Sequence, residues 1–196
     1  MISAIPQDLK FQGESTTVEI GDRSTIRECV TINRGTKAYG KTVVGKDCLI
    51  MAYVHIAHDC IIGDHVILVN SVALAGHVEI GDYGIVSGLS AVHQFVKIGA
   101  HVMIGGGAMV RKDVPPFITA AGEPLAYAGV NSVGLKRRNF SQEDINEIQT
   151  LYRTLYQSGM NVSQAVNRIK EQYPNRPLAD LILSFIEQSD RGLIRK

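Results

Sequence analysis

The amino-acid sequence predicts an all-β parallel β-helix followed by a small α-helical C-terminal domain, and three observations support this fold class. Apolar residues recur every six residues from Ile20 to Val110. Glycine often follows them directly, as in IIGD (61–64) and EIGD (79–82). After Ser141 the apolar spacing becomes that of helices. An aliphatic residue repeated every six positions and followed by glycine is typical of hexapeptide β-helices.

The β-helix is expected to span residues 1–116. Steps of six from Ile20 meet Ile, Leu or Val at fifteen of sixteen positions, and the exception, Ala38, lies in KAYGK (37–41), which we interpret as a loop. Three hexapeptides close one triangular coil, so each residue should lie beneath the residue 18 positions later, at the inter-strand spacing of ~4.8 Å. Residues 18–113 therefore predict a little over five coils. An antiparallel sheet would instead alternate with period two.

The repeat stops at DVPPF (113–117), because two prolines cannot continue ladder hydrogen bonding. Residues 117–140 are expected to connect the two parts. Residues 141–196 predict the helical domain. Ser141 and Asp144 resemble a capping box, a second helix fits Val162 to Tyr173, and a third begins at Pro177. These helices would cover the open end of the β-helix.

Composition narrows the possible functions. The 196 residues, 45% of them hydrophobic, can bury a core, and a net charge of +1 gives no basic field for nucleic acid. Cys29, Cys48 and Cys60 have no CxxC spacing, which favours a reducing cytoplasm over a disulfide framework or zinc ribbon. The start MISAIPQDLK is not a signal peptide, and no apolar run approaches ~18 residues, so we expect no membrane insertion.

The stretch HIAHDC (55–60) begins the candidate site. A register of 18 residues places His77 one coil from Asp59 and Gly76 one coil from His58. Together with His55, these residues should form one cluster about two coils high.

The other histidines lie further away. His93 is one coil further on and less well aligned. His65 and His101 follow glycine corners and are expected to be solvated turn residues.

Several chemistries are open to this cluster: a general base, a metal site, a nucleophilic Cys60, or a structural ladder of imidazoles on an inactive scaffold. Nothing nearby lowers the pKa of Cys60, so the nucleophile is disfavoured. Gamma-class carbonic anhydrases, which are metal-dependent hydratases, bind zinc through three histidines on the same type of repeat. The 35 residues from His58 to His93 fit their first spacing, but Ile98 stands where the third ligand would be.

Eight segments stand out, in order, along nearly the whole chain. They are QDLK (7–10), IRECVTINRGT (26–36), AHDC (57–60), LAGHVEIGD (74–82), AVHQFVKIGAHVMIGGG (91–107), DVPPF (113–117), GVNSVGLKRR (129–138) and RGLIR (191–195). Together they resemble the bacterial UDP-N-acetylglucosamine O-acyltransferase family. The resemblance implies a left-handed β-helix and a homotrimer with active sites between subunits.

The resemblance also implies a reaction. An (R)-3-hydroxyacyl chain would move from acyl carrier protein to the 3-hydroxyl of UDP-N-acetylglucosamine, the first step of lipid A synthesis, without a cofactor or metal. His58 matches the general base, Asp59 the carboxylate that supports it, and the N–H of Gly76 the oxyanion donor. Neighbouring side chains on a strand point to opposite faces, so direct contact between His58 and Asp59 requires a bent corner or a neighbouring chain.

Further residues match the family's substrate positions. Asp8 and Lys10 match residues that hold sugar and phosphate. His55 and His77 match substrate-positioning residues, and Asn131 and Arg137 lie toward the nucleotide. His93 and Gln94 match the acyl and pantetheine region. Gly106 matches the residue that limits acyl length, and glycine there favours a long chain.

A local basic patch is expected to bind the acidic carrier protein. Its members are Lys136, Arg137, Arg138 and Arg153.

The chain departs from the family pattern in two places. Val133 stands where the family carries a glutamate, which puts one nucleotide contact in doubt. The family also has further amino-terminal coils before the position of MISAIPQDLK, and a chain without them is expected to be less stable. A related N-acyltransferase of the same pathway is the nearest rival within the fold, but GVNSVGLKRR favours the O-acyltransferase.

Overall fold

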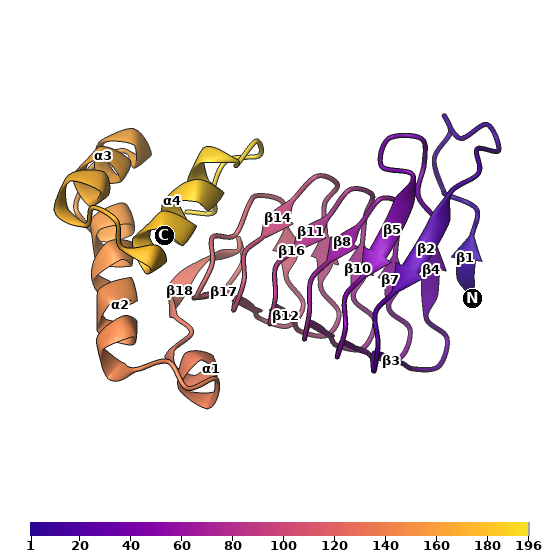
Figure 1. The fold of residues 1–196 in the computed structure, drawn as a ribbon, viewed down its shortest axis with the longest axis horizontal. Coiled ribbons are helices and arrows are strands. Elements are labelled where there is room, and N and C mark those ends of the chain that lie inside the picture. The colour runs from indigo at the N-terminus through magenta and orange to yellow at the C-terminus, as the bar shows by residue number, and fades with distance from the viewer. Residues whose placement is uncertain (196) are drawn as a thin grey trace.

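A computed structural model describes residues 1–195 as a stack of coils with helices at one end (Figure 1). The strands of the coils are β1 (Ile2–Ala4), β2 (Thr17–Ile20), β3 (Thr25–Ile26), β4 (Thr31–Asn33), β5 (Lys41–Val44), β6 (Leu49–Ile50), β7 (His55–Ile56), β8 (Ile61–Ile62), β9 (Ile67–Leu68), β10 (Ala73–Leu74), β11 (Glu79–Ile80), β12 (Ile85–Val86), β13 (Ala91–Val92), β14 (Lys97–Ile98), β15 (Met103–Ile104) and β16 (Met109–Val110).

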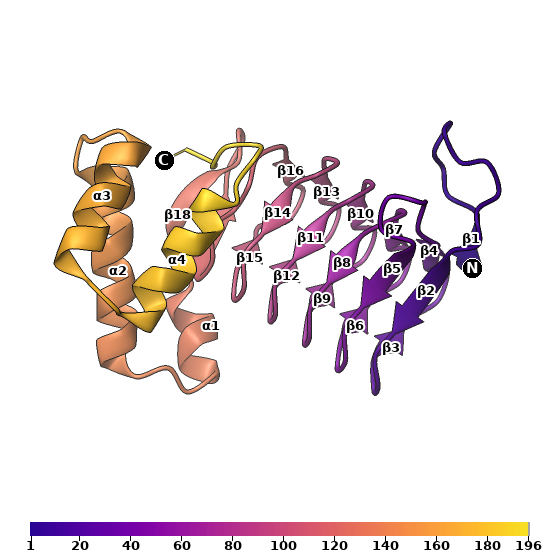
Figure 2. The same ribbon diagram turned by 45° about the horizontal axis from the view of Figure 1, so that its top comes forward.

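Three parallel sheets form the sides of the coils, in the orders β1-β4-β7-β10-β13-β16, β2-β5-β8-β11-β14 and β3-β6-β9-β12-β15 (Figure 2). From β5 onward the pairing has the predicted offset of 18, as in Val44 with Ile62 and Ile62 with Ile80. The predicted β-helix is therefore confirmed in both topology and register.

The three corners of the coils are named here after one residue each. The His58 corner comprises 57–60, 75–78 and 93–96; the Tyr83 corner 45–48, 63–66, 81–84 and 99–102; and the Leu89 corner 51–54, 69–72, 87–90 and 105–108. One residue of each corner has left-handed backbone, with φ of 58° at Asp59, 61° at His77 and 60° at His101. This turn redirects the chain at every sixth residue.

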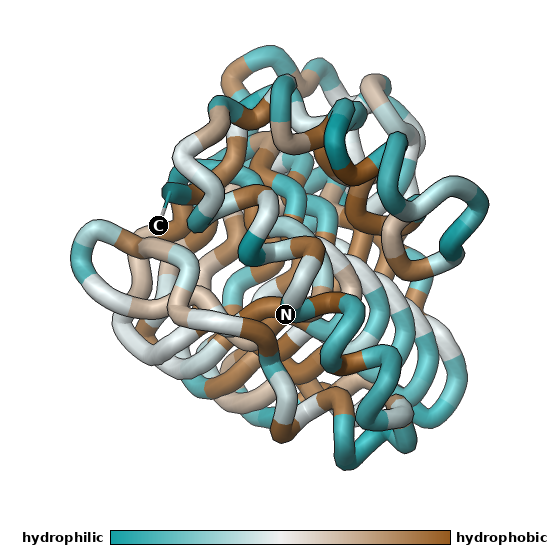
Figure 3. The backbone as a smooth tube through the Cα atoms, turned by 90° about the vertical axis from the view of Figure 1, so that its left-hand side faces the viewer, coloured by the Kyte–Doolittle hydropathy of each residue, from teal (hydrophilic) through white to brown (hydrophobic). Residues whose placement is uncertain are grey.

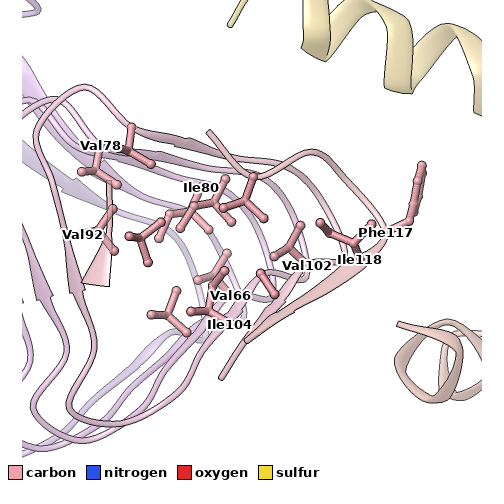
Figure 4. Packing of buried hydrophobic residues seen from close by; sticks show 14 of the residues in the cluster. Val66, Val78, Ile80, Val92, Val102, Ile104, Phe117 and Ile118 are labelled. Atoms are coloured by element: carbon pink, nitrogen blue, oxygen red, sulfur yellow. The ribbon is translucent and has the colours of Figure 1, made fainter. Parts of the chain in front are cut away.

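Two aliphatic columns fill the coils. The predicted column is buried from Val44 to Val110, whereas Ile20 in the first coil is 38% exposed. A second column, which the period of six from Ile20 does not reveal, lies two residues before it and includes Val66, Val78 and Val102. Their side chains point into the same interior (Figure 4), and apolar segments recur from coil to coil (Figure 3).

The loop predicted around Ala38 interrupts the register at one place. Ile20 pairs with Val44 and Ile32 pairs with Ile56, an offset of 24 rather than 18. Six extra residues therefore lie between β4 and β5. This insertion sits at the His58 corner, directly beneath HIAHDC.

The ladder extends one strand further than predicted. The chain passes both prolines at a corner, and β17 (Ile118–Ala121) then pairs in parallel with β15. β18 (Ala126–Val130) returns antiparallel to β17, and α1 (Ser132–Arg137) follows. The expected connecting segment thus contains regular structure.

The three predicted helices are confirmed as α2 (Gln142–Gln157), α3 (Val162–Gln172) and α4 (Pro177–Glu187). Ser141 and Asp144 form the expected capping box. The Tyr152 hydroxyl donates to the Pro116 carbonyl at 2.6 Å, and Lys97 Nζ donates to the Gln188 carbonyl at 2.9 Å, so the helices are tied to the last coils. Within residues 1–195, no helix has the length and apolar character needed to cross a membrane.

Candidate functional site

His58 and Asp59 are in direct contact within one chain. Nδ1 of His58 lies 2.8 Å from Oδ2 of Asp59. The contact is possible because the left-handed φ of Asp59 bends the corner and brings its carboxylate to the side of its neighbour, so no second chain is needed. Nε2 of His58 makes no hydrogen bond to any described residue, and 13% of the side chain is exposed. The imidazole is held at one nitrogen and available at the other.

The Asp59 carboxylate is fully buried and heavily hydrogen-bonded. The Thr36 backbone N–H donates to Oδ1 at 2.9 Å, the Thr36 hydroxyl donates to Oδ2 at 2.7 Å, and the Tyr39 N–H donates to Oδ1 at 3.3 Å. Burial opposes ionisation, but the hydrogen bonds from His58 and Thr36 outweigh it and lower the pKa of Asp59 below its ordinary value. The carboxylate is therefore charged at neutral pH and can hold a proton on Nδ1 of His58.

Gly76 lies against the His58 ring, as the register predicts. A Cβ on Gly76 would stand 2.6 Å from Cε1 and 2.7 Å from Nε2 of His58, so a larger residue would displace the imidazole. The next residue, His77, donates its N–H to the His58 carbonyl at 3.0 Å, whereas the Gly76 N–H has no acceptor among the described residues. A free N–H thus lies beside the free face of His58.

His77 completes the cluster. Its ring meets His58 edge-on at 5.1 Å and stacks on Phe95 at 4.5 Å, while Nε2 lies 3.8 Å from Oδ2 of Asp59. Burial lowers the pKa of His77, and the charges of Asp59 and Asp8 partly oppose this. His77 is predominantly neutral at neutral pH.

His55 lies on β7, and its Nδ1 is 2.7 Å from the Thr31 hydroxyl. Burial lowers the pKa of His55, so its ring is also predominantly neutral at neutral pH. The structure therefore brings together His58, Asp59, Gly76 and His77 as the register predicts, whereas the side-chain contact of His55 is with Thr31. Thr36 and Tyr39, which belong to the insertion, are additional members that sequence reasoning does not identify.

The same cluster could be considered as a metal site. His58, Asp59 and His77 offer ligand atoms within 4.8 Å of one another. A cation bound by Asp59 would have to displace hydrogen bonds from Thr36 and His58, and the carboxylate has no exposed surface. The arrangement favours acid–base chemistry.

The nucleophile hypothesis is weaker still. Cys60 is fully buried, and its burial raises the pKa of the thiol to about 12. A thiol with that pKa is almost entirely protonated at neutral pH.

The remaining expected site residues lie outside this cluster, although His93 and Gln94 belong to the next coil of the same corner. Lys10 and Gln94 are exposed, and Nδ1 of His93 lies 3.1 Å from Nη2 of Arg191, so the RGLIR segment returns to the coils. Gly106 belongs to the Leu89 corner, where the nearest atom to an added Cβ would be the Gly88 carbonyl oxygen at 3.5 Å. A single chain does not bring Gly106 to the His58 corner.

The Tyr83 corner corrects one expectation. His65, Tyr83, His101 and Phe117 stack in sequence, with ring centroids 4.5, 4.9 and 5.6 Å apart. Burial, reinforced by the charge of Arg138, lowers the pKa of His101 to about 4. The prediction of a solvated turn is wrong for His101, while His65 is both stacked and partly exposed. Phe117 points away from the aliphatic interior (Figure 4), and its ring stacks on that of His101.

Two residues expected to contact a ligand or the carrier protein make hydrogen bonds within the chain. Asn131 caps α1: its Oδ1 accepts the Gly134 N–H at 3.1 Å and its Nδ2 donates to the His101 carbonyl at 2.9 Å. The Arg138 guanidinium lies over the Tyr83 ring and donates to the Tyr83 carbonyl at 3.2 Å.

The exposed members of the expected basic patch are Lys136, Arg137 and Arg153, and Val133 is 63% exposed. Three of the four cations expected to form the patch are therefore exposed.

Comparison with known proteins gives consistent results. Residues 113–194 match a family model described as UDP N-acetylglucosamine O-acyltransferase, domain 2, and residues 41–76 match the bacterial transferase hexapeptide model. An acyl-[acyl-carrier-protein]–UDP-N-acetylglucosamine O-acyltransferase from Janthinobacterium sp. (strain Marseille) is 50% identical over 99% of this chain and 76% of its own length.

Solved structures agree. The UDP-N-acetylglucosamine acyltransferase of Bacteroides fragilis 9343 superimposes with a TM-score of 0.96 at 50% identity, covering 99% of this chain and 76% of that one. The corresponding Arabidopsis enzyme gives 0.93 at 34% identity, covering 98% and 71%.

Proposed function

This chain belongs to the UDP-N-acetylglucosamine O-acyltransferase family, with its left-handed parallel β-helix and helical C-terminal domain, and we propose that His58 is the general base of its reaction. The chain is an acyltransferase of lipid A synthesis that uses acyl carrier protein as donor and UDP-N-acetylglucosamine as acceptor. The proposal extends to an (R)-3-hydroxyacyl chain and the glucosamine 3-hydroxyl. The contact between His58 and Asp59 is the observation that supports it most strongly.

The geometry of His58, Asp59 and Gly76 suits direct transfer of the acyl chain from the thioester to the sugar hydroxyl. Asp59 keeps the proton on Nδ1, so neutral His58 can accept the sugar hydroxyl proton at Nε2 while the oxygen attacks the thioester carbonyl. Negative charge develops on the carbonyl oxygen, which would accept a hydrogen bond from the free N–H of Gly76. Collapse breaks the carbon–sulfur bond, and the departing thiolate takes the proton from Nε2. No covalent enzyme intermediate is required.

A homotrimer with active sites between subunits is part of the proposal. An apolar row runs along the outer face of β6, β9, β12 and β15, formed by Leu49, Ile67, Ile85 and Met103. Tyr53 and Leu89 at the adjoining corner are 64% and 75% exposed. A second copy would cover this face and could bring Gly106 or Arg137 of one subunit to the His58 corner of another.

Both substrates suit a cytoplasmic enzyme. Three free cysteines are compatible with such a reducing compartment.

The proposed function is tested by measuring acyl transfer directly. Purified protein would be incubated with UDP-N-acetylglucosamine and a series of (R)-3-hydroxyacyl carrier proteins, with and without chelator, and the products identified by mass. We expect 3-O-acylation that the chelator does not change. A product acylated elsewhere, activity abolished by the chelator, or hydration of carbon dioxide without transfer would contradict the proposal.

A further inference from the structure

The insertion beneath HIAHDC supplies the residue closest to the Asp59 carboxylate. We propose that Thr36 is a positioning residue that sets the proton affinity of His58 through Asp59. This inference rests on the proposed role of His58 as base, and it assigns a function to the irregular part of an otherwise regular repeat.

Thr36 contacts Asp59 with both of its donors. Its N–H donates to Oδ1 at 2.9 Å, and its hydroxyl donates to Oδ2 at 2.7 Å, the same oxygen that accepts Nδ1 of His58. Thr36 is 6% exposed and Asp59 is fully buried, so water does not replace either bond readily. One carboxylate oxygen is therefore shared between the candidate base and the insertion.

The loop holds Thr36 in place from several sides. The Gly40 N–H donates to the Thr36 carbonyl at 2.7 Å, and the Ala38 N–H donates to its hydroxyl oxygen at 3.2 Å. A Cβ on Gly35 would stand 2.3 Å from the Lys41 backbone nitrogen, so glycine allows the loop to lie against β5. The hydroxyl is fixed before any substrate binds.

The hydrogen bond from Thr36 to Asp59 changes the proton affinity of His58 in a defined direction. Each hydrogen bond to Oδ2 withdraws negative charge from it and weakens its attraction for a proton on the His58 ring. Without the Thr36 hydroxyl, Asp59 would stabilise the imidazolium form of His58 more strongly. His58 would then become protonated at a higher pH and lose its capacity as a base there.

The experiment compares pH profiles of kcat/KM for the wild type, Thr36→Val and Thr36→Ser. Valine keeps the shape but removes the hydroxyl, and we expect kcat/KM below the acidic limb to fall about 10-fold for each pH unit by which the limb moves. The acidic limb of the profile should move to higher pH. Thr36→Ser should restore both the rate and the limb.

A matched control removes another buried hydroxyl. Ser90 at the Leu89 corner donates to the Gly105 carbonyl at 3.1 Å, so Ser90→Ala should lower the melting temperature without moving the acidic limb. Should Thr36→Val unfold, Thr36→Cys retains a weaker donor and should give a smaller shift in the same direction.

The outcomes separate this inference from the proposed function. If Thr36→Val or Thr36→Cys lowers the melting temperature but leaves the acidic limb at its wild-type position, Thr36 is only structural and the inference is overturned. His58→Ala is assayed in parallel. Retained activity in that variant would overturn the general base itself, whatever Thr36 does.

Discussion

The His58 corner and the Tyr83 corner use the same turn, and each places histidines at its left-handed position, yet their rings have different partners. His77, with φ of 61°, faces Asp59 and a second imidazole. His101, with φ of 60°, lies between Tyr83 and Phe117, and its buried Nδ1 has no hydrogen-bond partner among the described residues. One corner has the polar partners that the proposed proton transfer requires, and the other is built for packing.

The difference shows that the hexapeptide repeat determines where a histidine lies, whereas the segments packed against the coils determine which groups its ring contacts. At the His58 corner, the insertion supplies donors that keep a buried carboxylate ionised. At the Tyr83 corner, α1 and the residues that follow it cover the stack with Arg138 and Phe140. Histidine by itself therefore does not distinguish the corner that holds the proposed base.

The strongest test of this contrast replaces one histidine at each corner by alanine. His58→Ala should lower kcat by ~10²–10⁴, the usual contribution of a general base, with little change in melting temperature. His65→Ala, at the Tyr83 corner, should retain nearly full turnover. Steady-state acyl transfer and thermal unfolding measure the two properties, and equal losses of activity in both variants would remove the distinction between the corners.

A second test uses glycines at two corners. Gly76→Ala places a Cβ 2.6 Å from Cε1 of His58 and should lower kcat by about 10-fold to 100-fold, since a displacement near 1 Å can have that effect. Gly106→Ala meets its nearest atom at 3.5 Å, so it should fold normally and retain turnover while shifting preference toward shorter acyl chains. Equal turnover of Gly76→Ala and wild type would argue against this placement of the base.

A third test concerns pH and stability at the Tyr83 corner. The pKa of His101 is about 4 in the folded chain and ~6.5 when unfolded, so the unfolded state binds the extra proton between these values. His101 therefore makes the free energy of unfolding rise with pH from 4 to ~6.5 and contributes no further slope above that range. His101→Phe should reduce the loss of melting temperature between pH 7.5 and pH 5. An unchanged loss would show that His101 is not buried in its neutral form.

The smallest effect is expected at the exposed cations Lys136 and Arg153. The double variant Lys136→Glu and Arg153→Glu should raise KM for the acyl carrier protein several-fold at low salt and leave kcat unchanged, because surface charges act mainly on encounter. The effect should diminish at higher salt. Arg168→Glu on α3 is a control for reversing one exposed charge, and an equal rise in its KM would show that the patch is not specific.

The six-residue period was sufficient to predict the coils and the contact between Gly76 and His58, because an unbroken repeat converts separation in sequence into position. It does not predict that Asp59 turns back to His58, since strand alternation places neighbouring residues on opposite faces and the contact depends on the left-handed turn. Thr36 lies inside the insertion, where the offset changes from 18 to 24. The break at Ala38 was the signal that could have located it.

The segment after the coils was harder to predict for a different reason. Asn131 and Arg138 carry polar groups that suit a ligand, but here they contact the His101 and Tyr83 carbonyls. Nothing in their local sequence reveals these internal hydrogen bonds. Only the tertiary position of α1 against the Tyr83 corner does so.

The six-residue insertion also affects how the chain can fold. Nearly identical aliphatic coils could stack with a slip of one whole coil and still bury most of their apolar surface, so the core alone discriminates weakly between alignments. The hydrogen bonds between Thr36 and Asp59 form in only one alignment, because only one corner holds the extra residues. The insertion thus fixes which coil lies on which. A misassembled stack would lose the hydrogen bonds between Thr36 and Asp59, which are the same bonds that we propose prepare the base.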